Sequence, residues 1–229
     1  MRVTISVKRG NYWQDFDYEP SGPEDTVAGA LTRINASDDI RDASGNPAAP
    51  IMWECSCLQK KCGACAMVIN GRPGLACDKK LSGLGSVIRL EPLRKFPLVR
   101  DLVVDRSIMR ENLKKMSAWL EDRSGLSAKD EDLACTASEC LQCGLCLEVC
   151  PNFAAGGKFP GMAAAVSMAR LLARLPDEQK KEASSLYEKR IFEGCGKSLA
   201  CRNICPAKID IDRMLVNSNA IAVWKRYLK

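Results

Sequence analysis

The sequence predicts an α+β protein with a sheet-containing first half and a helical second half. Three observations carry this prediction. Residues 2–8 alternate apolar and polar side chains with the period of a strand, whereas segments beyond residue 106 space their apolar residues at the period of a helix. The chain also holds thirteen cysteines, most of them in three runs that divide between the halves. We therefore expect two domains, residues 1–105 and residues 106–229.

Length and cysteine usage limit the class of protein. The chain has 229 residues, of which 46% are hydrophobic, so it has room for a core in each of two small domains. The number of cysteines is odd and the first residues lack the apolar core of a signal peptide, which favours metal-bound thiolates in a reducing compartment over disulfides. No apolar run approaches the length of a membrane span, so we expect any membrane association to come through a partner.

The absence of histidine excludes several kinds of site. Rieske-type clusters, His-ligated haem, Cys2His2 zinc fingers and histidine acid–base catalysis all need imidazole. The net charge is +6, but basic residues come as scattered pairs and aromatics are only 6% of the chain. Nucleic-acid binding favours a contiguous basic stripe with stacking aromatics, so we expect no nucleic-acid partner.

The middle run of cysteines has the spacing of a bacterial ferredoxin. It reads Cys140-Leu-Gln-Cys143-Gly-Leu-Cys146-Leu-Glu-Val-Cys150-Pro151. In such runs three thiolates hold one cubane cluster, while the fourth cysteine reaches a second cluster. The missing partners are available downstream, in Cys195, Cys201 and Cys205-Pro206. Structural zinc is the weaker alternative, because zinc ligands usually come as two separated pairs. The run therefore indicates electron transfer.

The first run has the spacing of a plant-type ferredoxin. Cys57-x4-Cys62-x2-Cys65, followed by the distant Cys77, is the arrangement that holds a [2Fe–2S] cluster. Gly63 permits a tight bend that turns backbone N–H groups toward cluster sulfurs, and Asn70-Gly71 predicts a type I′ hairpin that returns the chain to Cys77. A four-thiolate zinc knot remains an alternative here. Cys55 lies outside the spacing, and we interpret it as a spare thiol.

The elements around the first run follow the order of a β-grasp ferredoxin. A helix is expected at 27–34, and Asp25-Thr26 directly before it are residue types that cap the start of a helix. The expected elements are strands at 2–8 and 12–18, a helix at 27–34, strands at 66–69, 74–76 and 86–90, and an extended, proline-marked connector at 91–105.

The second half predicts an α-helical dicluster ferredoxin domain. Its expected elements are an amphipathic helix at 107–122, a polar linker at 123–132, helices at 160–175 and 176–192, and one or two helices after Pro206. Cys135 lies outside the cysteine runs and is interpreted as a second spare thiol.

The whole pattern resembles the iron–sulfur subunit of succinate dehydrogenases and fumarate reductases. The resemblance rests on the plant-type loop, the segment Arg100-Asp-Leu-Val-Val-Asp105 and the two ferredoxin-type runs, in that order. It implies a [4Fe–4S] cluster held by Cys140, Cys143, Cys146 and Cys205, and a [3Fe–4S] cluster held by Cys150, Cys195 and Cys201. In this chain Ser198 stands where a full four-iron run would carry cysteine.

The resemblance also implies a role and partners. Electrons would pass through [2Fe–2S], [4Fe–4S] and [3Fe–4S] clusters between an FAD-containing flavoprotein subunit and a quinone at a membrane-anchor subunit. The chain would be a peripheral part of an oxidoreductase, held by its partners at the cytoplasmic face of the membrane. It would carry no catalytic residues, because succinate and fumarate chemistry belongs to the flavoprotein.

Two departures concern the quinone end. Many quinone-linked members carry His where this chain has Gly196, and Trp residues where it has the segment 152–156. The same wire in a soluble or thiol/disulfide-linked fumarate (enoate) reductase is therefore an alternative. A free-standing ferredoxin and a zinc-stapled interaction protein are alternatives of other classes.

Overall fold

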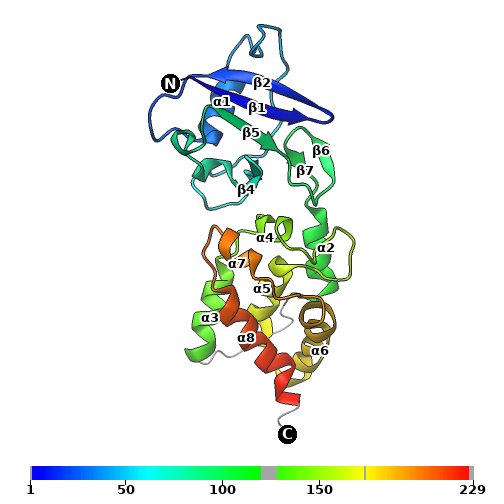
Figure 1. Cartoon of the computed structure of the whole chain (residues 1–229). Coiled ribbons are helices and arrows are strands. Elements are labelled where there is room, and N and C mark those ends of the chain that lie inside the picture. Colours follow the sequence, from blue (N-terminus) through cyan, green and yellow to red (C-terminus); the bar gives the residue numbers. More distant parts are fainter. Residues whose placement is uncertain (1, 120–127, 173, 227–229) are drawn as a thin grey trace. The chain divides into compact units, whose positions relative to one another are not determined.

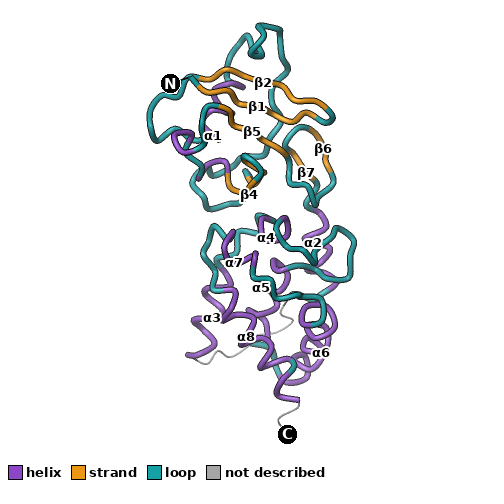
Figure 2. Tube along the Cα trace, in the orientation of Figure 1, coloured by secondary structure: helices purple, strands orange, loops and turns teal. Residues whose placement is uncertain are grey.

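The computed structural model describes residues 2–119, 128–172 and 174–226. The chain divides into two compact units, Met1–Asp105 and Arg106–Lys229 (Figure 1). Within the described residues, every strand belongs to the first unit, and the second unit is built from helices and loops (Figure 2).

The first unit is organised by a mixed five-stranded sheet. Its strands are β1 (Val3–Arg9), β2 (Tyr12–Tyr18), β3 (Ala66–Ile69), β4 (Arg72–Leu75) and β5 (Val87–Glu91), in the order β2-β1-β5-β3-β4. β1 pairs antiparallel with β2 and parallel with β5, while β3 pairs antiparallel with both β5 and β4. A mixed sheet accompanied by the single α-helix Val27–Asn35 among the described residues of this unit is the predicted β-grasp arrangement, so the fold class is confirmed for this unit.

One face of the sheet forms the core of the first unit. Its buried side chains recur at every second residue, as in Val3, Ile5 and Val7 of β1. Helix α1 (Val27–Asn35) buries an apolar stripe that includes Val27 and Leu31. The helix begins as predicted, because the Thr26 hydroxyl accepts a hydrogen bond from the Gly29 N–H at 3.1 Å.

The predicted connector at 91–105 contains a small second sheet. Strands β6 (Leu98–Arg100) and β7 (Val103–Val104) pair antiparallel around Asp101, whose φ is +49°. Aspartate tolerates this left-handed conformation better than most residues. The buried Asp101 carboxylate accepts a hydrogen bond from the Met52 N–H at 2.9 Å and lies 3.6 Å from Arg9. The expected connector thus contains extended strands, but it folds back on itself at Asp101.

The second unit is arranged around helix α5 (Met162–Leu172), which is buried along nearly its whole length. It contacts α2, α3, α4, α6 and α8. The remaining helices are α2 (Ser107–Lys115), α3 (Ala128–Ser138), α4 (Leu145–Glu148), α6 (Asp177–Tyr187), a π-helical turn (Glu188–Phe192), α7 (Ala200–Ile204) and α8 (Ile211–Ala222). The predicted helical class of this unit is confirmed.

Two predicted boundaries in the second unit were wrong. The helix expected at 107–122 ends at Lys115, and the left-handed Ser117 follows the end of the helix. The linker expected at 123–132 overlaps α3 from residue 128, because Leu133, Ala134 and Ala137 give that helix a buried face. Residues 120–127, on which both expectations partly fall, lie outside the described residues.

Candidate iron–sulfur cluster sites

The first cysteine loop turns its backbone N–H groups toward cysteine sulfurs. Leu58, Lys60 and Gly63 adopt left-handed φ angles of +53°, +62° and +75°. The N–H groups of Gln59 and Lys61 donate to Cys57 Sγ, each at 3.3 Å, and the Lys60 N–H donates to Cys77 Sγ at 3.3 Å. Successive inward N–H groups form a concave site for negative charge. The loop is therefore shaped to stabilise thiolates.

The Asn70-Gly71 hairpin joins the two ends of the first site. Both turn residues have positive φ, +47° and +77°, as a type I′ turn requires. The hairpin brings Cys77 Sγ to 3.4 Å from Cys65 Sγ, and the Ala76 N–H donates to the Cys65 carbonyl at 3.0 Å. The predicted return of the chain to Cys77 is confirmed.

The thiols of the first site have different surroundings. Backbone hydrogen bonds from Gln59 and Lys61, followed by a contact with Cys62, lower the pKa of Cys57 to about 7. Burial raises the pKa of Cys65 to about 12. These contacts connect Cys57, Cys62, Cys65 and Cys77, and none of them involves the exposed Cys55. The four thiols that the spacing selected are those that the fold gathers.

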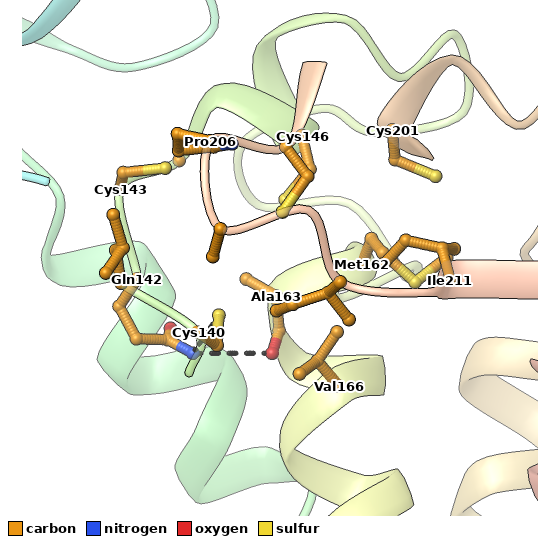
Figure 3. Close-up of a pocket in the computed structure, with 15 residues that line it drawn as sticks. Cys140, Gln142, Cys143, Cys146, Met162, Ala163, Val166, Cys201, Pro206 and Ile211 are labelled. Carbon is orange, nitrogen blue, oxygen red and sulfur yellow. Dashed lines mark hydrogen bonds between the residues drawn. The ribbon is translucent and has the colours of Figure 1, made fainter. Parts of the chain in front are cut away.

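A second group of thiols surrounds an apolar cavity of about 30 Å³ in the helical unit. Figure 3 shows Cys140, Cys143 and Cys146 around this space, and Cys205 also lines it. Left-handed Gln142 and Gly144 bend the chain between these cysteines. Burial raises the pKa of Cys143 to about 11 and that of Cys146 well above its ordinary value.

A third group consists of Cys150, Cys195 and Cys201. Burial raises the pKa of Cys201 to about 11, and the neighbouring thiols of Cys195 and Cys150 add to the shift. Cys201 also borders the cavity of the second group, but Figure 3 shows its sulfur turned away from Cys140, Cys143 and Cys146. The exposed Ser198 lies between Lys197 and Leu199, both left-handed.

The donors in these three groups fit iron–sulfur clusters. Thiolates are the ligands that such clusters use, and N–H donors to sulfur are the means by which proteins adjust them. Within the described ranges, no three His, Cys, Asp or Glu side chains gather closely enough to hold a single metal ion. Within the same ranges, no helix has both the length and the apolar character needed to cross a bilayer.

The structure adds two side chains that the cysteine spacing did not reveal. Asp78 forms an ion pair with Lys60 at 2.9 Å, across the first site. The Gln142 amide lies 3.4 Å from Cys140 Sγ in the second site. Both residues adjoin a ligand-type cysteine in sequence or lie between two of them. Their closeness to cysteines in the sequence could have drawn attention to them. The sequence does not show where their side chains point, because that depends on tertiary structure.

Two family models match the chain. A 2Fe-2S iron-sulfur cluster binding domain matches residues 1–111, and a 4Fe-4S dicluster domain matches residues 136–209. The first match contains Cys57, Cys62, Cys65 and Cys77. The second contains the cysteines of the other two groups. The matches support the expected [2Fe–2S] and [4Fe–4S] clusters.

Similarity to whole proteins decides the family. A succinate dehydrogenase iron–sulfur subunit of Bacillus subtilis is 34% identical over 219 residues, which cover 91% of this chain and 85% of the relative. The chain belongs to the family of succinate dehydrogenase and fumarate reductase iron–sulfur subunits. A fumarate reductase iron–sulfur subunit of Haemophilus influenzae is 30% identical, and the aligned region covers 98% of this chain and 94% of that relative.

Two further comparisons concern extent and fold. An uncharacterized iron–sulfur protein of Methanocaldococcus jannaschii is 32% identical over 98% of this chain, which spans only 45% of that protein. A chain of the Mycobacterium smegmatis Sdh1 complex in the apo form superposes with a TM-score of 0.77 at 21% identity, covering 99% of this chain and 97% of that one. The latter likeness shows a shared fold. Family membership makes this protein an electron-transfer component of an oxidoreductase, as the resemblance implied.

Proposed function

We propose that this chain carries three iron–sulfur clusters that connect an FAD-containing flavoprotein subunit with a quinone at a membrane anchor. The observation that carries the proposal is the separation of the thiols into three groups. Cys57, Cys62, Cys65 and Cys77 hold [2Fe–2S]; Cys140, Cys143, Cys146 and Cys205 hold [4Fe–4S]; and Cys150, Cys195 and Cys201 hold [3Fe–4S]. When bound, the clusters supply one-electron transfer between the two partners.

The protein's own residues hold and insulate these groups. Backbone donors at 59–61 stabilise the negative charge of the first thiolates. Met162, Val166 and Ile211 line the second cavity and exclude water from it. Succinate or fumarate chemistry takes place on the flavoprotein, because the proposed role of this chain is electron transfer. The partners hold the chain peripherally at the cytoplasmic face of the membrane.

A cavity beside the third group of thiols supports a largely apolar molecule as the electron acceptor. It measures about 280 Å³, adjoins Cys195 and is lined mainly by aromatic and aliphatic side chains, with Lys197, Asp212 and Asn219 among its polar residues. Small-molecule sites commonly combine an apolar lining with a few polar groups. A quinone head group matches this chemistry, since its ring is apolar and its carbonyl oxygens accept hydrogen bonds.

One observation favours a second candidate at this end of the wire. A Cβ atom at Gly196 would lie 2.6 Å from Asn152 Oδ1, so the Asn152 side chain occupies the space beside the backbone there. Many quinone-linked members carry a histidine at this position, whereas this chain has Gly196 with the Asn152 side chain packed against it. The second candidate is therefore the same three-cluster wire in a soluble or thiol/disulfide-linked fumarate reductase.

Purification of the native complex tests the proposal. A tagged chain should retain an FAD-containing subunit and an integral membrane subunit. The complex should transfer electrons between succinate or fumarate and a quinone, and a quinone-site inhibitor should stop this transfer while leaving succinate-dependent reduction of an artificial dye intact. A flavoprotein partner with thiol-dependent, quinone-independent fumarate reduction would establish the second candidate. A brown protein that purifies alone would contradict both.

A further inference from the structure

Gln142 occupies an unusual backbone conformation inside the second cysteine run. It lies between Cys140 and Cys143, and its φ is +50°. Glutamine seldom adopts a left-handed conformation, and such residues persist where their surroundings hold them in place. The conformation directs the side chain toward helix α5, where it shares the wall of the cavity with Cys140 and Ala163.

The Gln142 amide connects a cysteine sulfur to this helix. Its Nε2 lies 3.4 Å from Cys140 Sγ and 3.5 Å from Ser167 Oγ. It also lies 3.5 Å from the Ala163 carbonyl oxygen, a contact marked by a dashed line in Figure 3. A glutamine amide has two N–H donors, so one is available to the sulfur while the other is held by α5. Ser167 donates to the same Ala163 carbonyl at 3.3 Å.

The surroundings of Cys140 make this donor important. Met162, Val166 and Ile211 give the cavity an apolar lining, and a hydrogen bond is electrostatically stronger there than in water. Within this lining, the Gln142 amide Nε2 is a hydrogen-bond donor 3.4 Å from Cys140 Sγ. Gln142 thus supplies compensation for negative charge on this sulfur.

We propose that Gln142 is a positioning residue that raises the reduction potential of the [4Fe–4S] cluster through its N–H···Sγ hydrogen bond to Cys140. The inference rests on the proposed function, which makes Cys140 a ligand of that cluster. The reduced cluster carries one more negative charge than the oxidised cluster. A donor to the ligand sulfur therefore stabilises the reduced form more strongly.

An EPR redox titration of Gln142→Met in the whole complex tests this proposal. Methionine has a similar length and volume but donates no hydrogen bond. The ratio of reduced to oxidised [4Fe–4S] cluster at a fixed potential should fall about tenfold, which is 59 mV for one electron. Ser167→Ala is the matched control, because it removes one contact of the amide and leaves the amide–sulfur contact in place. Its [4Fe–4S] potential, and the [2Fe–2S] potential in both variants, should remain unchanged.

A second measurement applies even if Gln142→Met fails to assemble. In the native complex, glutamine labelled with ¹⁵N in the side chain should give a weak ¹⁵N hyperfine coupling to the reduced [4Fe–4S] cluster. Absence of this coupling overturns the inference, as does an unchanged potential in an intact Gln142→Met complex. A four-iron signal that survives Cys140→Ser instead overturns the ligand assignment in the proposed function, which separates the two failures.

Discussion

At the residue scale, each thiol group combines burial with local hydrogen-bond donors. Burial raises the pKa of Cys65, Cys143 and Cys201, since a thiolate loses water there. Backbone N–H groups have the opposite effect on Cys57. Positively charged iron supplies the remaining stabilisation of the buried thiolates when a cluster binds.

The choice of ligand in the first loop is testable at two neighbouring thiols. Cys57 accepts two backbone hydrogen bonds, whereas Cys55 is exposed and outside that network. Cys57→Ser should abolish or alter the [2Fe–2S] EPR signal, and Cys55→Ser should leave it unchanged. The reverse pattern would make Cys55 the ligand. Unchanged signals in both variants would mean that the two thiols substitute for each other.

Two adjacent lysines of that loop should differ in their effect on the cluster. Lys60 is paired with Asp78 at 2.9 Å, so Lys60→Gln leaves an unpaired carboxylate beside the site. Its [2Fe–2S] potential should fall by roughly 20 to 40 mV at low salt, which is within the energy of an exposed ion pair. Asp78→Asn should raise the potential. Lys61→Gln is the matched control; an equal fall in that variant would show that the ion pair has no special role.

At the element scale, left-handed residues shape the cysteine loops. Positive φ occurs at 58, 60 and 63 in the first loop, at 142 and 144 in the second, and at 197 and 199 in the third. Such residues reverse the chain over a short span and turn consecutive N–H groups inward. Helix α5 then supplies a wall of the second site from a separate part of the sequence.

Gly161, at the start of α5, should tolerate substitution poorly. Its φ is +86°, and a Cβ atom there would overlap the Leu147 side chain in α4, between Cys146 and Cys150. Gly161→Ala should destabilise the protein by about 1 to 3 kcal/mol beyond the cost of the backbone conformation. Gly156→Ala is the control, because its φ is +79° and its Cβ would meet nothing within 4 Å.

Chemical unfolding of the two variants measures the difference. Iron content provides an independent measure, because displaced α4 would move Cys146. Equal stability and equal iron content in the two variants would show that α4 accommodates the added methyl group with no loss of stability and no displacement of Cys146.

At the scale of the whole molecule, each unit has its own core and its own thiol groups. The division at residue 105 places the first group in the sheet unit and the other two in the helical unit. The proposed wire ends at the third group, whose iron content depends on whether Ser198 is a ligand. A serine hydroxyl ionises far less readily than a thiol and is therefore a poor ligand for a cluster iron.

The third cluster should contain three irons. The oxidised complex should show the near-isotropic EPR signal of an oxidised [3Fe–4S] cluster. Ser198→Cys should convert it to a four-iron cluster of lower potential and slow transfer to the terminal acceptor. Ser198→Ala is the control and should retain the three-iron signal. Two four-iron clusters in the native complex, one of which loses an iron in Ser198→Ala, would instead identify Ser198 as a ligand.

Cysteine spacing and periodicity were sufficient to predict the sheet-containing and helical halves and the first group of thiols. The resemblance that this spacing revealed pointed to the family, and it alone implied how the remaining cysteines divide between two clusters. These features are local: a ligand loop is specified by a few consecutive residues, and a strand or helix by its repeat. Tertiary structure decided what local patterns do not contain. It ended α2 at Lys115, extended α3 into the expected linker and folded the connector around Asp101. It also directed Gln142 to Cys140 and Asp78 to Lys60, because the direction of a side chain depends on the segments packed around it.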